Sequence, residues 1–135
     1  MNAPSLLMAS KKEAKKIVCG TEVGIFYEKF RNIPPQFFDK LQKGGSKYYG
    51  WCTVTMVYAQ YPSTCTGPEN VQIHAGDACG FVITIPNHDF RLYHAGDTNV
   101  FSDMKIIDDL YKPNVAFLPI GDCLGMGPRE AAHAV

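Results

Sequence analysis

The feature that most constrains the fold of this sequence is a pair of apolar runs separated by one short turn. Residues 80–85 and 90–94 are rich in β-branched and aromatic side chains, which is the composition that favours β-strands. Residues 86–89 read Pro-Asn-His-Asp, and these residue types are typical of tight turns. The sequence therefore predicts a β-hairpin over residues 80–94, and any fold for the chain has to contain it.

The part of the sequence before this hairpin predicts a loose segment, a strand, a helix and another hairpin. Residues 1–15 are expected to form a loose N-terminal segment. The apolar run at 16–19 predicts a short strand. Thr21 is then expected to cap a helix over about residues 22–31, where apolar side chains recur at helical spacing. Aromatic and β-branched residues return over 48–58, which predicts the other hairpin.

The pattern changes again downstream of the main hairpin. Ser102 is expected to cap a helix over about residues 103–111, with Leu110 among its inward-facing side chains. Residues 115–120 form an almost continuous apolar run, which is typical of a strand that is covered on both faces. Together these elements predict an alternation of strands and helices in the α/β class.

A last helix is expected to begin at the Gly-Pro pair of residues 127–128, because proline is favoured at the first helical position. That helix reaches Val135 after about two turns, and helices this short are marginal on their own. We therefore expect the chain to be cut within this helix, so that residues 16–135 form one partial domain.

The composition is that of an ordinary globular protein and gives no basis for several classes of partner. Thirteen basic residues balance thirteen acidic ones, which gives no reason to expect a nucleic acid or an anionic membrane as a partner. The five cysteines are odd in number and contain no C-x-x-C pair, so no disulfide framework is indicated. The N-terminus lacks the charge order of a secretory signal, and no apolar run approaches the length of a membrane span. We expect a cytoplasmic protein.

The tetrapeptide His-Ala-Gly-Asp occurs twice, at residues 74–77 and 94–97, and each copy lies beside a predicted strand. A carboxylate on a glycine-permitted turn at the end of a strand is well placed to reach a ligand. Imidazole nitrogen and carboxylate oxygen are donors that borderline and hard divalent metals use. The alternative is that Gly-Asp is a simple turn whose aspartate satisfies nearby backbone N–H groups.

The second copy belongs to a longer run of residues that resembles the metal-dependent hydrolases of the metallo-β-lactamase superfamily related to L-ascorbate-6-phosphate lactonase. The matching blocks are 44–46, 54–56, 76–77, 80–83, 93–98, 101–104, 118–122 and 126–132. The resemblance implies a four-layer αββα sandwich with one or two divalent metals at the edge of the sheets. It also implies that this chain is an incomplete sandwich, which lacks the first half of the domain and ends within a C-terminal helix.

The resemblance implies roles for four residues. Asp97 would be the carboxylate that bridges the metals, Zn²⁺ or Mn²⁺ in that family. His94 and Thr98 would flank it as supporting residues, and Asp122 would either line the pocket or cap its turn. The superfamily's H-x-H-x-D-H motif is absent from this chain, and Tyr61 stands where a metal-binding histidine is expected.

Three functions follow as expectations. The first is a metal-dependent hydrolase in which a metal-activated water attacks a small polar ester, lactone or phosphorylated metabolite. The second is a truncated or degenerate, catalytically inactive remnant of that family, whose exposed sheet face would need an oligomer or a partner to cover it. The third is a small binding module that uses both His-Ala-Gly-Asp turns.

Overall fold

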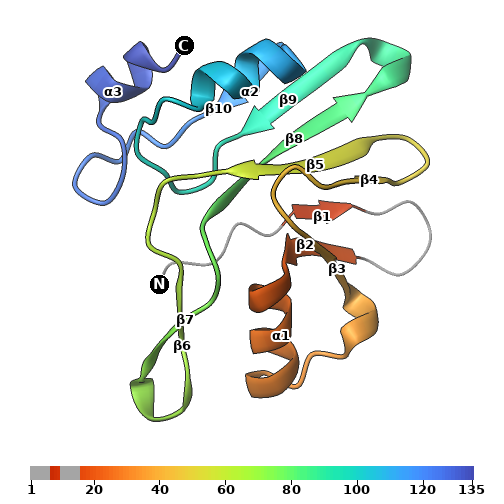
Figure 1. Ribbon diagram of the computed structural model, residues 1–135, viewed down its shortest axis with the longest axis vertical. Helices are drawn as coiled ribbons and strands as arrows, with labels where there is room; N and C mark the ends of the chain where they lie inside the picture. Colours follow the sequence, from red (N-terminus) through yellow and green to blue (C-terminus); the bar gives the residue numbers. More distant parts are fainter. Residues whose placement is uncertain (1–6, 10–15) are drawn as a thin grey trace. The chain divides into compact units, whose positions relative to one another are not determined.

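The computed structural model describes residues 7–9 and 16–135 and consists of two compact units (Figure 1). The first unit contains the described residues up to Gln42 together with residues 62–77, and the second contains residues 43–61 and 78–135. The segment expected to be loose, residues 1–15, lies outside the described residues except for 7–9, which form a strand.

A three-stranded sheet and one helix form the framework of the first unit. Its elements are β1 (Leu7–Ala9), β2 (Lys16–Gly20), α1 (Thr21–Phe30), η1 (Pro35–Phe37) and β3 (Phe38–Leu41). Strand β2 pairs antiparallel with β1 and parallel with β3, so α1 and η1 make the crossover between two parallel strands. The helix buries Val23 and Phe26 in a core cluster that also contains Phe38 and Cys65.

The helix α1 begins one residue earlier than the sequence predicts. Gly20, in extended conformation, is its N-cap, and no side chain caps it. The prediction that Thr21 is the cap is therefore wrong. Its hydroxyl accepts a hydrogen bond from Nε2 of Gln42 at 2.9 Å instead, so it does not serve the free N–H groups of the first turn.

The remainder of the first unit is a small antiparallel hairpin. It consists of β6 (Thr64–Thr66), η2 (Pro68–Asn70) and β7 (Gln72–His74). Cys65 pairs with Ile73 across the hairpin, and the Cys65 side chain reaches the same core cluster as α1.

A five-stranded sheet with the order β10-β9-β8-β5-β4 forms the second unit. Its strands are β4 (Ser46–Tyr48), β5 (Thr53–Tyr58), β8 (Cys79–Ile85), β9 (Phe90–His94) and β10 (Val115–Phe117). β10 pairs parallel with β9, and all other neighbours are antiparallel. The predicted hairpins over residues 48–58 and 80–94 are thereby confirmed, with η3 (Pro86–His88) in the turn of the second.

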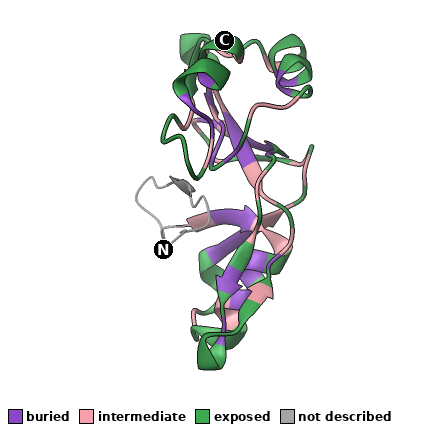
Figure 2. Ribbon diagram, turned by 90° about the vertical axis from the view of Figure 1, so that its left-hand side faces the viewer, coloured by how far each residue is buried: buried purple, intermediate pink, exposed green. Residues whose placement is uncertain are grey.

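Helix α2 (Met104–Tyr111) packs on this sheet. Ile107 joins a core cluster with Val57, Val82 and Tyr93. Figure 2 shows buried residues along the strands, whereas most residues of α2 are exposed. Leu110 was expected to face inward but is 69% exposed, because the helix presents only its Met104 and Ile107 side to the sheet.

Two helix starts test the capping predictions in this unit. The residue before α2 is Asp103, which caps it without a side-chain hydrogen bond, and the Ser102 hydroxyl bonds to Asp103 Oδ1 at 3.0 Å instead. The prediction that Ser102 caps this helix is therefore wrong. The other helix, α3 (Pro128–His133), begins as predicted, with Gly127 as N-cap and proline at its first position.

The apolar run at 115–120 was expected to be a strand covered on both faces, and this prediction is wrong. Only Val115–Phe117 forms a strand, and Phe117 and Ile120 are 55% and 63% exposed. β10 is the edge of the sheet: it pairs with β9 on one side, and none of the described strands pairs with it on the other. The apolar composition is that of an interior strand, but all three residues of β10 are exposed, and since successive side chains of a strand point to opposite faces, neither face is covered.

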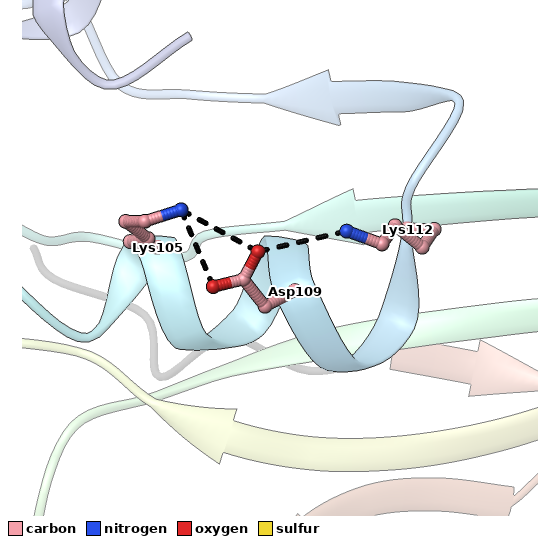
Figure 3. Close-up of polar contacts among 3 residues, drawn as sticks. All are labelled: Lys105, Asp109 and Lys112. Atoms are coloured by element: carbon pink, nitrogen blue, oxygen red, sulfur yellow. Dashed lines mark hydrogen bonds and ion pairs between the residues drawn. The ribbon is translucent and has the colours of Figure 1, made fainter.

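The outer side of α2 carries a small group of charges (Figure 3). Nζ of Lys105 lies 3.3 Å from Oδ2 of Asp109, and Nζ of Lys112 lies 3.6 Å from Oδ1. The hydrogen bond from Lys105 lowers the pKa of Asp109, and the charges of both lysines act in the same direction. Within the described part of the chain, no helix has the length and apolar character that would let it cross a membrane.

Candidate functional site

The candidate site lies at one edge of the five-stranded sheet. Strands β5, β9 and β10 run in the same direction, since β8 is antiparallel to both β5 and β9 and β10 is parallel to β9. The loops that follow these three strands therefore leave the sheet at the same end, where the carboxyl ends of the three strands lie. This is the carboxyl edge, where polar side chains on loops commonly form ligand sites in sheets of this kind.

The second His-Ala-Gly-Asp turn follows β9 directly. Gly96 has a φ of +71°, a left-handed conformation that glycine adopts without strain. The Gly96 N–H donates to Nδ1 of His94 at 3.1 Å, and the Ala95 N–H donates to the carbonyl of Phe117 at 3.0 Å. These bonds fix the turn and leave Asp97 exposed at its end.

A close approach between strands sets the position of this turn. A Cβ placed on Gly80 in β8 would lie 2.8 Å from the carbonyl oxygen of His94 and 2.9 Å from that of Ala95. Both neighbours are backbone atoms, so they cannot move aside as a flexible side chain would. The backbone that leads to Asp97 therefore depends on a glycine at residue 80.

Thr98 is fully buried and joins two loops. Its hydroxyl accepts a hydrogen bond from the Gln60 N–H at 2.9 Å and donates one to the Asn99 carbonyl at 2.8 Å. The Asn99 N–H in turn donates to the Gln60 carbonyl at 3.0 Å. The loop after β5 is thus bonded to the loop that carries Asp97.

Asp122 lies in the loop after β10, at the same edge of the sheet. Its backbone is left-handed, with a φ of +58°. Its N–H donates to the carbonyl of Met126 at 3.0 Å, and its carbonyl accepts from Gly125 at 2.7 Å. The backbone of Asp122 therefore closes a tight turn over residues 122–126, while its side chain is exposed.

The first His-Ala-Gly-Asp copy has the same local conformation but belongs to the other unit. It follows β7, and Gly76 has a φ of +76°. A Cβ at Gly76 would lie 2.7 Å from Oε2 of Glu22, so this turn packs against the first turn of α1. The prediction that each Gly-Asp pair lies on a glycine-permitted turn is confirmed for both copies, and the strand β7 before the first copy was not predicted.

The described residues do not by themselves fit a metal site. Among them, no group of three or more His, Cys, Asp or Glu side chains is arranged so that it could hold a metal ion, whereas zinc sites in proteins usually have three or four protein ligands. None of the five cysteines, all of which lie within the described residues, forms a disulfide. Burial raises the pKa of the Cys79 thiol to about 11, which disfavours the reactive thiolate.

Reasoning from side-chain motifs did not identify Gln60 and Gly80. Gln60 acts through its backbone N–H and carbonyl, which every residue type except proline provides. Gly80 acts through the absence of a side chain, and a glycine at the start of a strand is the one signal that could have found it.

Comparisons with known proteins give one family. The family model described as the beta-lactamase superfamily domain matches residues 31–135. A UPF0173 metal-dependent hydrolase of Koribacter versatilis is 43% identical over 127 residues, which is 93% of this chain and 52% of that protein. One of Chloroflexus aurantiacus is 37% identical over 131 residues, 96% of this chain and 52% of that protein.

The fold is also shared with a solved structure. A metallo hydrolase of the archaeon Ignicoccus hospitalis, Igni18, superimposes with a TM-score of 0.67 at 23% identity, over 88% of this chain and 47% of the archaeal one. The predicted α/β fold of the metallo-β-lactamase type is thereby confirmed. The chain spans about half the length of the curated relatives named above.

Proposed function

This chain belongs to the beta-lactamase superfamily, and from that premise we propose that it supplies the Asp97 part of a metal-dependent hydrolase site. The observation that carries the proposal is the position of Asp97. Its exposed carboxylate stands at the carboxyl edge of the sheet, on a turn fixed by hydrogen bonds from Gly96 and Ala95. Carboxylate oxygen is a normal ligand for Zn²⁺ and Mn²⁺.

A metal site with three or more ligands would need at least one further ligand from polypeptide other than the described residues, because these supply no group of three ligands. The curated relatives, which are about twice as long, carry the name metal-dependent hydrolase. In this proposal His94 and Thr98 support the turn that presents Asp97, and Asp122 stands on the neighbouring loop. The substrate is a small polar ester, lactone or phosphorylated metabolite, as the resemblance to L-ascorbate-6-phosphate lactonase suggests.

A second candidate is a catalytically inactive member of the family. Two observations favour it: the absence of a three-ligand group among the described residues, and Tyr61 at the position where the family resemblance places a histidine. A neutral phenol is a poor ligand for zinc compared with imidazole. In this alternative the fold persists without the metal chemistry.

Metal content and turnover separate the two candidates when the chain is combined with polypeptide that carries the further ligands. The chain is co-expressed with the part of the Koribacter versatilis relative that lies outside the match, and the complex is loaded with Zn²⁺ or Mn²⁺, desalted and analysed for bound metal by mass spectrometry. Its hydrolysis of a nitrophenyl phosphodiester and of an aromatic lactone is followed. The hydrolase proposal expects bound metal and turnover that Asp97→Asn reduces and that Asp108→Asn, at an exposed carboxylate on α2, leaves unchanged. An assembled complex without metal and without turnover would reject the proposal for this chain and favour the inactive alternative.

A further inference from the structure

We infer that Thr98 is a positioning residue, whose buried hydroxyl holds together the loops at the carboxyl edge of the sheet and so fixes the direction of Asp97. The inference deepens the proposed function and rests on it for the role of Asp97. The contacts that carry it are independent of any metal and lie within the second unit.

The first step is the burial of the hydroxyl at a loop crossing. Thr98 has no exposed surface, although it immediately follows the exposed Asp97. A buried hydroxyl needs hydrogen-bond partners, because leaving it unpaired is destabilising. The Thr98 hydroxyl acts both as acceptor and as donor, since it accepts from the Gln60 N–H at 2.9 Å and donates to the Asn99 carbonyl at 2.8 Å.

The second step is the number of elements that meet at this residue. The Gln60 carbonyl receives the Asn99 N–H at 3.0 Å, so the two loops are bonded in both directions. On either side of this crossing, the ring of Tyr58, the last residue of β5, packs edge to face with the ring of Phe101, with centroids 5.5 Å apart. The loop after β10 is also close, because a Cβ on Gly125 would lie 3.8 Å from the Thr98 carbonyl oxygen.

The third step is the requirement for this side chain in particular. The hydrogen bond between Gln60 and Thr98 joins residues 38 positions apart in the chain. It is made by the Thr98 side chain, whereas the hydrogen bond between Asn99 and Gln60 is made by backbone groups alone. Valine has nearly the same shape as threonine but can neither accept nor donate, so Thr98→Val leaves the Gln60 N–H unpaired. Serine keeps the hydroxyl and loses only a methyl group, which makes Thr98→Ser the matched control.

Amide hydrogen exchange measured by NMR tests the inference directly. In Thr98→Val, the Gln60 amide is expected to exchange about tenfold faster or more, as the loss of a hydrogen bond to a buried group gives. The Asn99 amide is expected to follow it, while the amides in the middle of β8 and β9 stay unchanged. Thr98→Ser is expected to restore the slow exchange of Gln60 to within a factor of about three. Thr98→Ala removes the hydroxyl without adding a methyl group and replaces the valine variant if that variant does not fold.

A second readout follows the direction of Asp97. The ¹³C resonance of the Asp97 carboxyl carbon is expected to change its chemical shift and to broaden in the valine or alanine variant. In Thr98→Ser its chemical shift is expected to return to the wild-type value. Unchanged exchange at Gln60 after loss of the hydroxyl, or equal acceleration in the serine variant, would overturn the inference. Failure of the wild-type chain to bind Zn²⁺ when it is combined with polypeptide that carries the further ligands would instead reject the proposed function and leave the exchange result standing, so the two failures are distinguishable.

Discussion

Tyr93 offers the sharpest quantitative test of the packing in the second unit. Its ring, in β9, packs beside Val57, Val82 and Ile107 and is 5% exposed, yet its hydroxyl has no hydrogen-bond partner among the described residues. A buried polar group without a partner costs about 1–3 kcal/mol. Tyr93→Phe removes this oxygen and keeps the ring, so we expect the substitution to raise the free energy of unfolding at pH 7 by about 1 kcal/mol.

The same hydroxyl makes a second prediction at alkaline pH. Burial raises the pKa of Tyr93 from 10.0 to about 12, so the folded state holds this proton more tightly than the unfolded chain does. The free energy of unfolding of the wild type therefore does not depend on this group below pH 10, and it falls as the pH rises through about 12. A difference of 2 units corresponds to about 2.7 kcal/mol of stability lost across this window.

Urea unfolding followed by circular dichroism at pH 7, 10, 11 and 12 measures both effects. The quantity to compare is the difference between the Tyr93→Phe and wild-type free energies of unfolding at each pH. Cys79, whose pKa burial raises to about 11, also lowers stability over the alkaline range, but it is present in both proteins and cancels in the difference. Tyr58→Phe, at a side chain that is 42% exposed, is the control and is expected to change stability by less than about 0.5 kcal/mol at pH 7.

The reasoning predicts that the advantage of Tyr93→Phe grows between pH 10 and 12. A variant less stable than wild type at pH 7 would show that the hydroxyl has a partner in solution. A difference that stays constant up to pH 12 would show that burial does not hold the proton on Tyr93.

Three further substitutions test other parts of the second unit. Gly80→Ala places a Cβ within 3 Å of two backbone carbonyls and is expected to lower the free energy of unfolding by about 1–3 kcal/mol and to shift the NMR signals of residues 95–97; an unchanged spectrum would contradict the close approach. The exposed edge strand β10 is expected to cause concentration-dependent association in analytical ultracentrifugation, and Phe117→Lys, which adds a charge to it, is expected to weaken that association; wild-type chain that stays monomeric at all concentrations would contradict this. Asp109→Asn removes a carboxylate whose pKa the lysines lower. In urea unfolding at low salt, the variant is expected to be slightly less stable than the wild type above pH 4. The difference is expected to fade as the pH falls below 4 and to disappear in 1 M NaCl.

The turns and strands of this protein could be predicted from the sequence wherever the cause is local. The hairpin over residues 80–94 follows from two β-prone runs and turn residues between them, and α3 begins where a Gly-Pro pair predicts it. Both His-Ala-Gly-Asp turns have the left-handed glycine that their sequence suggests. The capping predictions failed at Thr21 and Ser102, because a hydroxyl there finds another nearby partner.

By itself, the sequence determined the α/β class, the family resemblance and the exposed turn at Asp97. Each of these depends on residues that are adjacent in the chain or are matched as a continuous motif. The tertiary structure alone decided which surfaces are covered: the run at 115–120 is apolar enough for an interior strand, but β10 lies at an edge and Phe117 stays exposed. It also decided the contact between Thr98 and Gln60, because a side chain that bonds a backbone 38 residues away leaves no pattern in either segment. Burial and long-range hydrogen bonds depend on which elements become neighbours in space, and local sequence does not specify those neighbours.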